Sequence, residues 1–324
     1  MWKKKFVYLY FDPEKQTKDR EKAIELKNQN IPDALYKYGP FDKESHTLDL
    51  LKNDKMWLSN PNKFNDPFDC AISSIPKLVI NEYFREGIDG IINNISLELA
   101  PEEIDHIKSS TEPTKELLRI INTKNVSNRK TQKMVELMRE ADENAEAILK
   151  DSKEEYSKFY SKLIKESKDK TFITCFSEKN DSILMWSHYA DRHKGLCIEY
   201  DFSSLENHDL LKQFLFPVIY ENTIFDATKF FIHSKILHNI SYRAAITKSH
   251  EWSYEKEWRY VNTINKKSNE HYINLPKPKS VYLGAKANEE NTKDVIKIAK
   301  ERNFEVYKME MRDSKFYLDA ICIK

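Results

Sequence analysis

The sequence predicts an α+β protein whose core is a mixed or antiparallel sheet. Strand-like segments follow one another irregularly, without the steady strand–helix alternation of a parallel sheet. A long helical stretch interrupts them, and 40% of the residues are hydrophobic and 12% aromatic, which suffices for a packed core. For 324 residues we expect one domain, 1–324, with a helical insertion at 76–168.

The N-terminal third is predicted to contain short helices and strands that end at turns. We expect helices at 17–30 and 47–51 and strands at 34–38 and 55–59. A dense cluster of Pro, Asn and Asp follows at 61–69, which is typical of a tight turn.

The insertion at 76–168 has apolar residues at helical spacing among balanced Lys and Glu, which predicts three or four helices. Such helices usually present a solvated face, and the alternative is a lid or a docking surface for a partner protein. Among the apolar positions are Ile104, Ile107, Leu117, Leu118, Ile121, Met134, Leu137, Met138, Ala141, Ala145 and Ile148.

The remainder of the chain returns to strands. Strands are predicted at 171–177, 195–202, 216–220, 257–264, 272–275, 280–283, 304–311 and 316–323. Helices are predicted at 182–190, 223–248 and 289–302.

Charge and targeting signals predict a soluble cytoplasmic protein without membrane contact. Lys and Arg number 53 against 52 Asp and Glu, so no bulk attraction to nucleic acid or acidic lipid is expected. The apolar run at 6–11 is too short for a signal peptide, and no segment is long enough to cross a bilayer. Four cysteines without paired short spacing argue against a disulfide framework or a structural zinc site.

The sharpest local pattern lies at residues 252–259, Trp-Ser-Tyr-Glu-Lys-Glu-Trp-Arg. On a strand, Glu255 and Glu257 point to the same face. Two adjacent carboxylates raise each other's pKa, bind a pair of hydroxyls or hold a cation. The alternative is a solvated strand face with Lys256 and Arg259 as counter-charges, but the flanking Trp and Tyr rings favour a functional site.

A second candidate segment combines hydroxyl groups with aromatic rings. Thr174 and Ser177 place oxygens at the end of a strand, where loops build sites. Trp186 and Tyr189 lie on one side of the following helix, where they line a pocket or pack in the core.

Three further patterns are weighed against structural explanations. His188 and His193 lie about 140° apart around a helix, so a shared metal is disfavoured, and no metal site is expected. Nothing in the sequence orients His188 toward Cys175 as a nucleophilic pair. The turn at 64–69 is interpreted as structural.

The strand at 34–38 places Tyr36 and Tyr38 on one face and Lys37 on the other. Lys37 is a candidate clamp for a carboxylate or phosphate group of a substrate. Neither GxxxxGK[ST] nor GxGxxG occurs, so no phosphate-cradling loop is expected.

The motifs at 35–38, 57–61 with 64–69, 175–177, 185–191, 195–201 and 252–259 resemble, in this order, a bacterial family known as domain of unknown function 2971. The resemblance covers about residues 34–285. Gly39 departs from it, because the family usually has Arg after Tyr-Lys-Tyr, so an anion contact attributed to that Arg is not expected here.

The order of the motifs is also similar to that of ADP-ribosyltransferases. This resemblance implies a split sheet, NAD as substrate, and ADP-ribosyl transfer or NAD hydrolysis by a toxin or phage-defence effector. Lys37 or Tyr38 matches the first-strand position, and Thr174, Cys175 and Ser177 match the hydroxyl-bearing strand. Glu255 and Glu257 match the Glu-x-Glu motif, with Glu257 catalytic.

In this interpretation Trp186 or Tyr189 stacks on nicotinamide, and the acceptor is a nucleic acid or a protein. One alternative is a metal-dependent nuclease or nucleic-acid-binding module with Asp66, Asp69 and Glu199 around a divalent ion. Another is a recognition domain without catalytic activity.

Overall fold

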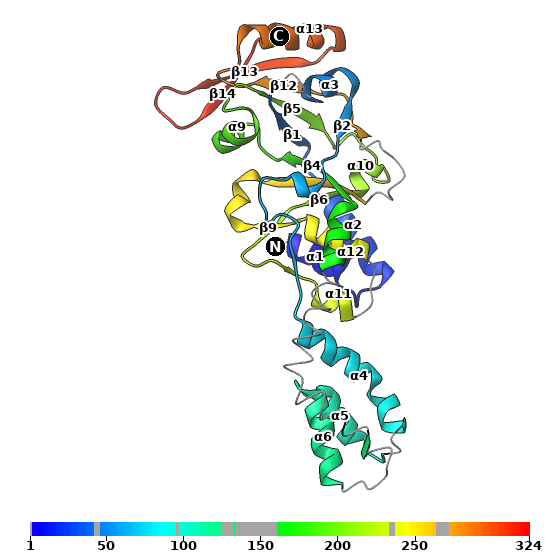
Figure 1. Cartoon of the computed structure of the whole chain (residues 1–324). Coiled ribbons are helices and arrows are strands. Elements are labelled where there is room, and N and C mark those ends of the chain that lie inside the picture. The colour runs from blue at the N-terminus through cyan, green and yellow to red at the C-terminus, as the bar shows by residue number, and fades with distance from the viewer. Residues whose placement is uncertain are drawn as a thin grey trace. The chain divides into compact units, whose positions relative to one another are not determined.

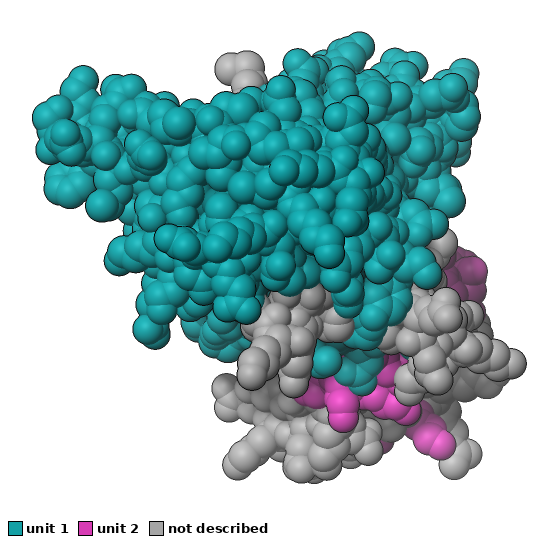
Figure 2. Space-filling model, turned by 90° about the horizontal axis from the view of Figure 1, so that it is seen from above, with its two compact units in different colours: residues 1–71, 167–225, 237–324 teal, residues 72–166, 226–236 magenta. Residues whose placement is uncertain are grey.

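The computed structural model describes residues 2–41, 46–94, 97–124, 132, 133, 136, 161–232, 237–263 and 272–324. The chain divides into two compact units (Figure 2). The larger unit comprises residues 1–71, 167–225 and 237–324, and the smaller comprises 72–166 and 226–236.

The described part of the larger unit forms an eight-stranded sheet (Figure 1). Neighbouring strands are antiparallel except β12 and β13, which are parallel, so the predicted α+β class with a mixed sheet is confirmed. In spatial order the strands are β14 (Leu318–Cys322), β13 (Glu305–Met311), β12 (Ser280–Leu283), β5 (Leu196–Asp201), β1 (Ala34–Gly39), β4 (Thr171–Ser177), β10 (Glu257–Thr263) and β6 (Leu215–Pro217).

Helices cover both faces of this sheet because its central strands are apolar on both sides. On one face, α3 (His46–Asn53) and α13 (Glu289–Arg302) pack on a core that includes Leu35, Ile198 and Trp258. On the other face, α9 (Ile183–Tyr189) packs through Met185 and Trp186. The sheet is therefore the middle layer of the larger unit.

The sheet opens between β1 and β4. These strands pair at one position, Tyr36 with Ser177, whereas β4 pairs with β10 along its whole length. Beyond the opening, Ser59 lies beside β4 in the place of β1. Its N–H donates to the Ile173 carbonyl and its carbonyl accepts from the Ile173 N–H, with N···O distances of 2.8 and 2.9 Å. The segment that follows Ser59 is thereby brought to the opening.

Shorter elements complete the larger unit. Aromatic rings of α1 (Trp2–Phe11) pack on Phe216 of β6. The remaining elements are α2 (Thr17–Asn28), β2 (Lys55–Trp57), η1 (Pro61–Lys63), α10 (Leu210–Gln213), β7 (Ile219–Glu221), α12 (Leu237–Ala245), β9 (Thr247–Ser249), η2 (His250–Glu255) and β11 (Tyr272–Asn274). β7 pairs with β9, and β2 with β11.

The predicted helix at 223–248 is wrong. The segment contains β8 (Phe225–Asp226), α11 (Thr228–Ile232), α12 and β9, and residues 233–236 lie outside the described residues. Asp226 accepts hydrogen bonds from the backbone and hydroxyl of Thr228, which favours a new helix start there. Parallel pairing with β7 makes 247–249 a strand, so tertiary contacts override the helical pattern.

The smaller unit is described as helices around their own apolar core. Its elements include β3 (Ile72–Ser73), α4 (Pro76–Asn94), α5 (Pro101–Ser109), α6 (Pro113–Thr123) and α11. α5 and α6 begin at Pro, a residue without a backbone N–H, and an N–H in the first turn of a helix would have no intrahelical acceptor. Leu117 and Ile121 of α6 face the core. The apolar positions predicted at 134–148 lie outside the described residues. Of the helices described, none combines the length and apolar character needed to span a bilayer.

Candidate active site

A pocket of about 170 Å³ lies in the larger unit where β1 and β4 diverge. Its walls come from β1, β4, α9, β9, β10 and the segment after Ser59. Aromatic rings of Tyr36, Tyr38, Phe64 and Tyr189 line it, together with the charged groups of Lys37, Asp69, Lys248, Glu257 and Arg259.

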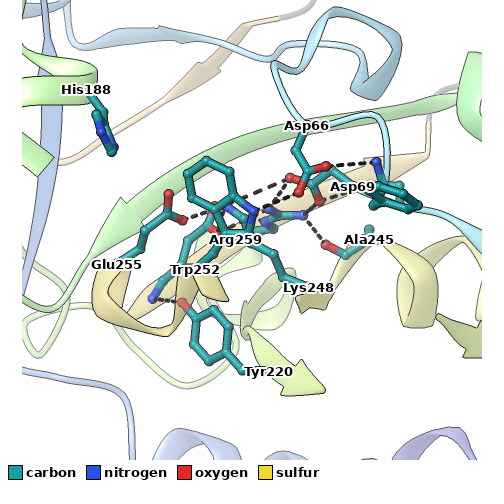
Figure 3. Close-up of polar contacts among 12 residues, drawn as sticks. Asp66, Asp69, His188, Tyr220, Ala245, Lys248, Trp252, Glu255 and Arg259 are labelled. Atoms are coloured by element: carbon teal, nitrogen blue, oxygen red, sulfur yellow. Dashed lines mark hydrogen bonds and ion pairs between the residues drawn. The ribbon is translucent and has the colours of Figure 1, made fainter. Parts of the chain in front are cut away.

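Arg259, which lines this pocket, is the centre of a charged network (Figure 3). Its side chain is fully buried and forms a bidentate pair with Asp69, at 2.6 and 2.9 Å. It also donates to Glu257 at 2.9 and 3.1 Å and to the Ala245 carbonyl at 2.7 Å. A buried guanidinium needs such a set of acceptors, so these contacts fix the carboxylate of Glu257.

Lys248 joins the two glutamates of the 252–259 motif. Its ammonium donates to Glu255 and, at 3.1 Å, to Glu257, and it lies 5.0 Å from the centre of the Trp252 ring. Burial alone lowers the pKa of Lys248, but the neighbouring Glu257 and Glu255 carboxylates raise it above its usual value. Lys248 is therefore a buried cation shared by two carboxylates.

The pKa values of the two glutamates are displaced in opposite directions. For Glu255, burial and the nearby Glu257 raise the pKa to about 7, against the opposing effects of Lys248 and Tyr189. For Glu257, burial also acts to raise the pKa, but Arg259 and Lys248 hold that pKa well below its usual value. The two carboxyl groups therefore differ in proton affinity: the surroundings of Glu257 favour its ionised form, and those of Glu255 favour a bound proton.

The backbone places these carboxylates in a way the sequence did not predict. Glu255 ends the 3₁₀ helix η2, and Lys256 adopts a left-handed conformation with φ of 47° before β10 begins at Glu257. The Ser177 hydroxyl donates to the Glu255 carbonyl at 2.6 Å, and the Tyr220 hydroxyl accepts from the Glu257 N–H at 2.8 Å. The prediction of two glutamates on one strand face is wrong for Glu255, although Lys248 still joins the two side chains.

Tyr189 connects Glu255 to the pocket. The Glu255 side chain is buried behind the lining residues, and the Tyr189 hydroxyl donates to its Oε1 at 2.6 Å. Tyr189 ends α9, whose first turn is capped by the Ser182 hydroxyl. Tyr189 lines the pocket, so its hydroxyl connects the pocket wall to the buried Glu255 carboxyl group.

Lys37 bridges the opening in the sheet. Its ammonium donates to the Thr174 hydroxyl and to the Cys175 carbonyl, both at 3.1 Å. Burial lowers its pKa. An ammonium carries three donors, so these two bonds leave one for a ligand in the pocket.

The other predicted contacts have structural partners. The fully buried Trp186 donates its indole N–H to the Asn180 carbonyl at 2.7 Å and packs edge-on against Tyr38, so it lies in the core. The Tyr38 hydroxyl donates to the Lys179 carbonyl at 2.8 Å while its ring lines the pocket. The structure thus brings Lys37, Tyr38, Ser177, Tyr189 and Glu257 to one pocket and places Thr174 and Trp186 behind its walls.

Sequence reasoning missed three charged groups of this site. Lys248 fell within a segment predicted as helix, Arg259 was considered a surface counter-charge, and Asp69 was assigned to a turn. The sequence did contain a signal for Arg259: side chains alternate between the two faces of a strand, so Arg259 lies on the same face of β10 as Glu257.

The three acidic residues considered for a metal-dependent nuclease have other partners in the structure. Asp66 accepts from the Trp252 indole and the Phe68 N–H, and Asp69 is paired with Arg259. Glu199 accepts from two hydroxyls and Lys279. Over the part of the chain that is described, no group of three His, Cys, Asp or Glu side chains is placed to hold a metal ion.

The Cys175–His188 pair is not assembled either. His188 Nδ1 lies 2.9 Å from the Tyr254 hydroxyl. Burial raises the pKa of the Cys175 thiol well above its usual value, and the nearby Glu257 carboxylate raises it further. The thiol is therefore poorly suited to act as a nucleophile.

A family model described as "Protein of unknown function (DUF2971)" matches residues 185–260. This range is narrower than the resemblance expected from the motifs, and it supports that resemblance. It includes Tyr189, Lys248, Glu255, Glu257 and Arg259. No curated protein and no solved structure matches the chain.

Proposed function

We propose that this pocket cleaves the bond between nicotinamide and ribose in NAD, as an ADP-ribosyltransferase or NAD hydrolase. The observation that carries the proposal is the pair Glu255 and Glu257. They share Lys248, their pKa values are displaced in opposite directions, and they adjoin a pocket lined by tyrosines. Pairs of carboxyl groups displaced in this way are typical of acid–base sites.

Glu257 is assigned to the electrostatic part of the reaction. Cleavage of the glycosidic bond passes through a state in which the ribose carries positive charge. Glu257 lines the pocket and stays ionised, and Arg259 fixes the position of its carboxylate. A fixed anion beside the sugar stabilises the developing positive charge.

Glu255 is assigned to proton transfer. The ribose–nicotinamide bond breaks with its electron pair on the pyridinium ring, so nicotinamide leaves as a neutral molecule. A water or acceptor hydroxyl forms the new bond to ribose and gives its proton to the Tyr189 oxygen. The Tyr189 proton passes to Glu255, whose pKa of about 7 suits a base at neutral pH.

The shape of the pocket agrees with a single aromatic ring as its occupant. Its volume is about 170 Å³, and the Tyr36, Tyr38 and Tyr189 rings line it. Such rings pack edge-on or offset against a flat heterocycle. We assign the remaining donor of Lys37 to the carboxamide oxygen of nicotinamide.

The biological setting in this proposal is a toxin or phage-defence effector that consumes NAD or modifies a nucleic acid or protein. Expression in a bacterial host tests it. The unaltered chain is expected to lower cellular NAD or arrest growth, and Glu257→Gln is expected to abolish both effects.

The direct test measures release of nicotinamide from labelled NAD, with and without nucleic-acid and protein acceptors. Glu257→Gln is expected to lower the rate by a factor of about 10² to 10³, the usual effect of removing a charge-stabilising group. Glu255→Gln and Tyr189→Phe are expected to lower it by about 10². Glu251→Gln, on the exposed face of η2, is the matched control and should leave the rate unchanged.

Two results would contradict the proposal. One is no nicotinamide release under any condition, and the other is release that Glu257→Gln leaves unchanged. Thermal unfolding adds a second readout, because a ligand that binds the folded state raises the Tm. A rise with NAD but no turnover would identify a recognition domain, and a rise with Mg²⁺ or Mn²⁺ alone would favour the nuclease alternative.

A further inference from the structure

β14 forms one edge of the eight-stranded sheet, and among the described residues no strand pairs with its outer side. Protein sheets usually protect such an edge with Lys, Pro or a bulge. Residues 318–323 read Leu-Asp-Ala-Ile-Cys-Ile, and their one charge, Asp319, is paired with Arg312 at 2.7 Å. Ala320, Ile321, Cys322 and Ile323 are exposed.

The hydrogen bonds to β13 determine which backbone groups point outward. The N–H of Ile323 donates to the Val306 carbonyl at 2.9 Å, and that of Arg312 donates to the Tyr317 carbonyl at 3.2 Å. Inward groups alternate with outward ones along an antiparallel strand. The N–H and C=O groups of Leu318, Ala320 and Cys322 therefore point away from the sheet.

We propose that a second copy of this chain pairs antiparallel with β14 about a two-fold axis at Ala320. Leu318 then lies opposite Cys322 of the second copy, and Ala320 lies opposite its own equivalent. In this register the outward groups of both strands exchange about six main-chain hydrogen bonds. The result is one continuous sheet through both copies.

A second copy fits this edge for two reasons. A two-fold axis brings the same residues of both chains together, and this register places Asp319 opposite Ile321, so no charge directly faces a like charge. The formal net charge of the chain is only +1, so the copies repel each other weakly.

The apolar side chains around the edge are buried by the same arrangement. Tyr317 is 43% exposed and Ile323 is 41% exposed, and this register places them opposite each other. In this register Phe316, which is fully exposed, lies opposite Lys324, whose ammonium is held by the Ala299 and Phe304 carbonyls of its own chain at 3.0 and 2.6 Å. Figure 1 shows the β13–β14 hairpin at the end of the sheet, away from β1 and β4.

The test measures the mass of the chain in solution by light scattering over a range of concentrations. The unaltered chain is expected to form a dimer. Ala320→Lys and Ala320→Asp each place like charges opposite each other and should weaken the dimer by about tenfold or more. An equal mixture of the two variants should restore it, because Lys then faces Asp across the axis.

Two controls keep this test decisive. Leu210→Lys changes an exposed apolar residue of α10, just before β6 at the opposite edge of the sheet, and should leave the dimer intact. Ala320→Pro removes an N–H that β13 does not use, so circular dichroism should stay unchanged while the dimer is lost.

A chain that is monomeric throughout overturns the proposal. So does a dimer that persists in all Ala320 variants, or a mixture that stays monomeric. The proposal is independent of NAD chemistry, which nicotinamide release measures separately.

Discussion

Glu255 and Glu199 are both buried glutamates in the larger unit, yet their chemical states differ. Glu199 accepts hydrogen bonds from the Ser280 and Tyr282 hydroxyls, both at 2.6 Å, and from Lys279 at 3.0 Å. Burial acts to raise its pKa, but these donors lower the pKa below the usual value. Glu255 also has donors, but burial and then the neighbouring Glu257 carboxylate raise its pKa to about 7.

The comparison shows that burial alone does not make a carboxyl group a proton acceptor near pH 7. Both groups are shielded from water, and both have a lysine and a tyrosine hydroxyl among their partners. They differ in two respects: Glu199 has a further donor, the Ser280 hydroxyl, and Glu255 has beside it a second carboxylate, Glu257, that Arg259 holds in place. The Glu255 pair therefore has the features of a functional site, and Glu199 has those of a structural one.

The largest expected effect follows from removing Arg259. Arg259→Met leaves Asp69 and Glu257 buried beside one remaining cation, Lys248. We expect a loss of about 3–5 kcal/mol in the free energy of unfolding, as for other broken buried ion pairs. Urea denaturation measures it.

Arg312→Met is the matched control, because Arg312 forms an exposed bidentate pair with Asp319. It should change the free energy of unfolding much less. Equal losses in both variants would contradict the central role of Arg259.

The second prediction concerns the dependence of stability on pH. The folded-state pKa of Glu255, about 7, lies above the ordinary glutamate pKa of 4.5. Its contribution to stability is therefore fully present below about pH 4.5 and is lost as pH rises through 7, by about 3 kcal/mol over this interval. Glu255→Gln should remove this loss, so its stability relative to the unaltered chain should increase from pH 4.5 to 7.

The measurement is urea denaturation at a series of pH values. Glu257→Gln supplies the control, because it removes the like charge and should return the pKa of Glu255 toward its usual value. A difference between Glu255→Gln and the unaltered chain that does not vary with pH would contradict the elevated pKa.

The smallest expected effects belong to Glu199 and its partner Lys279, beginning with Glu199. Its folded-state pKa is lowered, so its contribution to stability is present above the unfolded value and is lost as pH falls through the folded value. Glu199→Gln should therefore lower stability at neutral pH by about 1–2 kcal/mol and have less effect in acid. The sign is opposite to that for Glu255.

Lys279→Met should have a still smaller effect, about 0–1 kcal/mol, because its side chain is 63% exposed. Both variants should leave nicotinamide release unchanged. A loss of activity in Glu199→Gln would show that the two glutamates act together.

The sequence predicted the elements with strong local patterns. The strands β1, β4 and β5 and the helix α13 lie within a residue or two of their predicted bounds, because their apolar spacing and end signals are local. The helix α1 had no prediction, and the segment at 223–248 was wrong, because packing and strand pairing decide these elements.

The site was predictable only in part for the same reason. Glu255, Glu257, Lys37 and Tyr189 stand in recognisable motifs, and the fold brings them to one pocket or directly behind it. The partner of Arg259 is Asp69, 190 residues away in the chain. No local pattern indicates which of the many acidic residues will meet a buried arginine.

This separation of 190 residues also bears on when the site forms during synthesis. Domains fold as units, and a ribosome adds residues one after another. Asp69 leaves the ribosome long before Arg259, so the network around Glu257 cannot assemble until β10 has been made. A nascent or prematurely terminated chain that lacks β10 therefore has no complete pocket, and any activity of the site begins only after residue 263 has been translated.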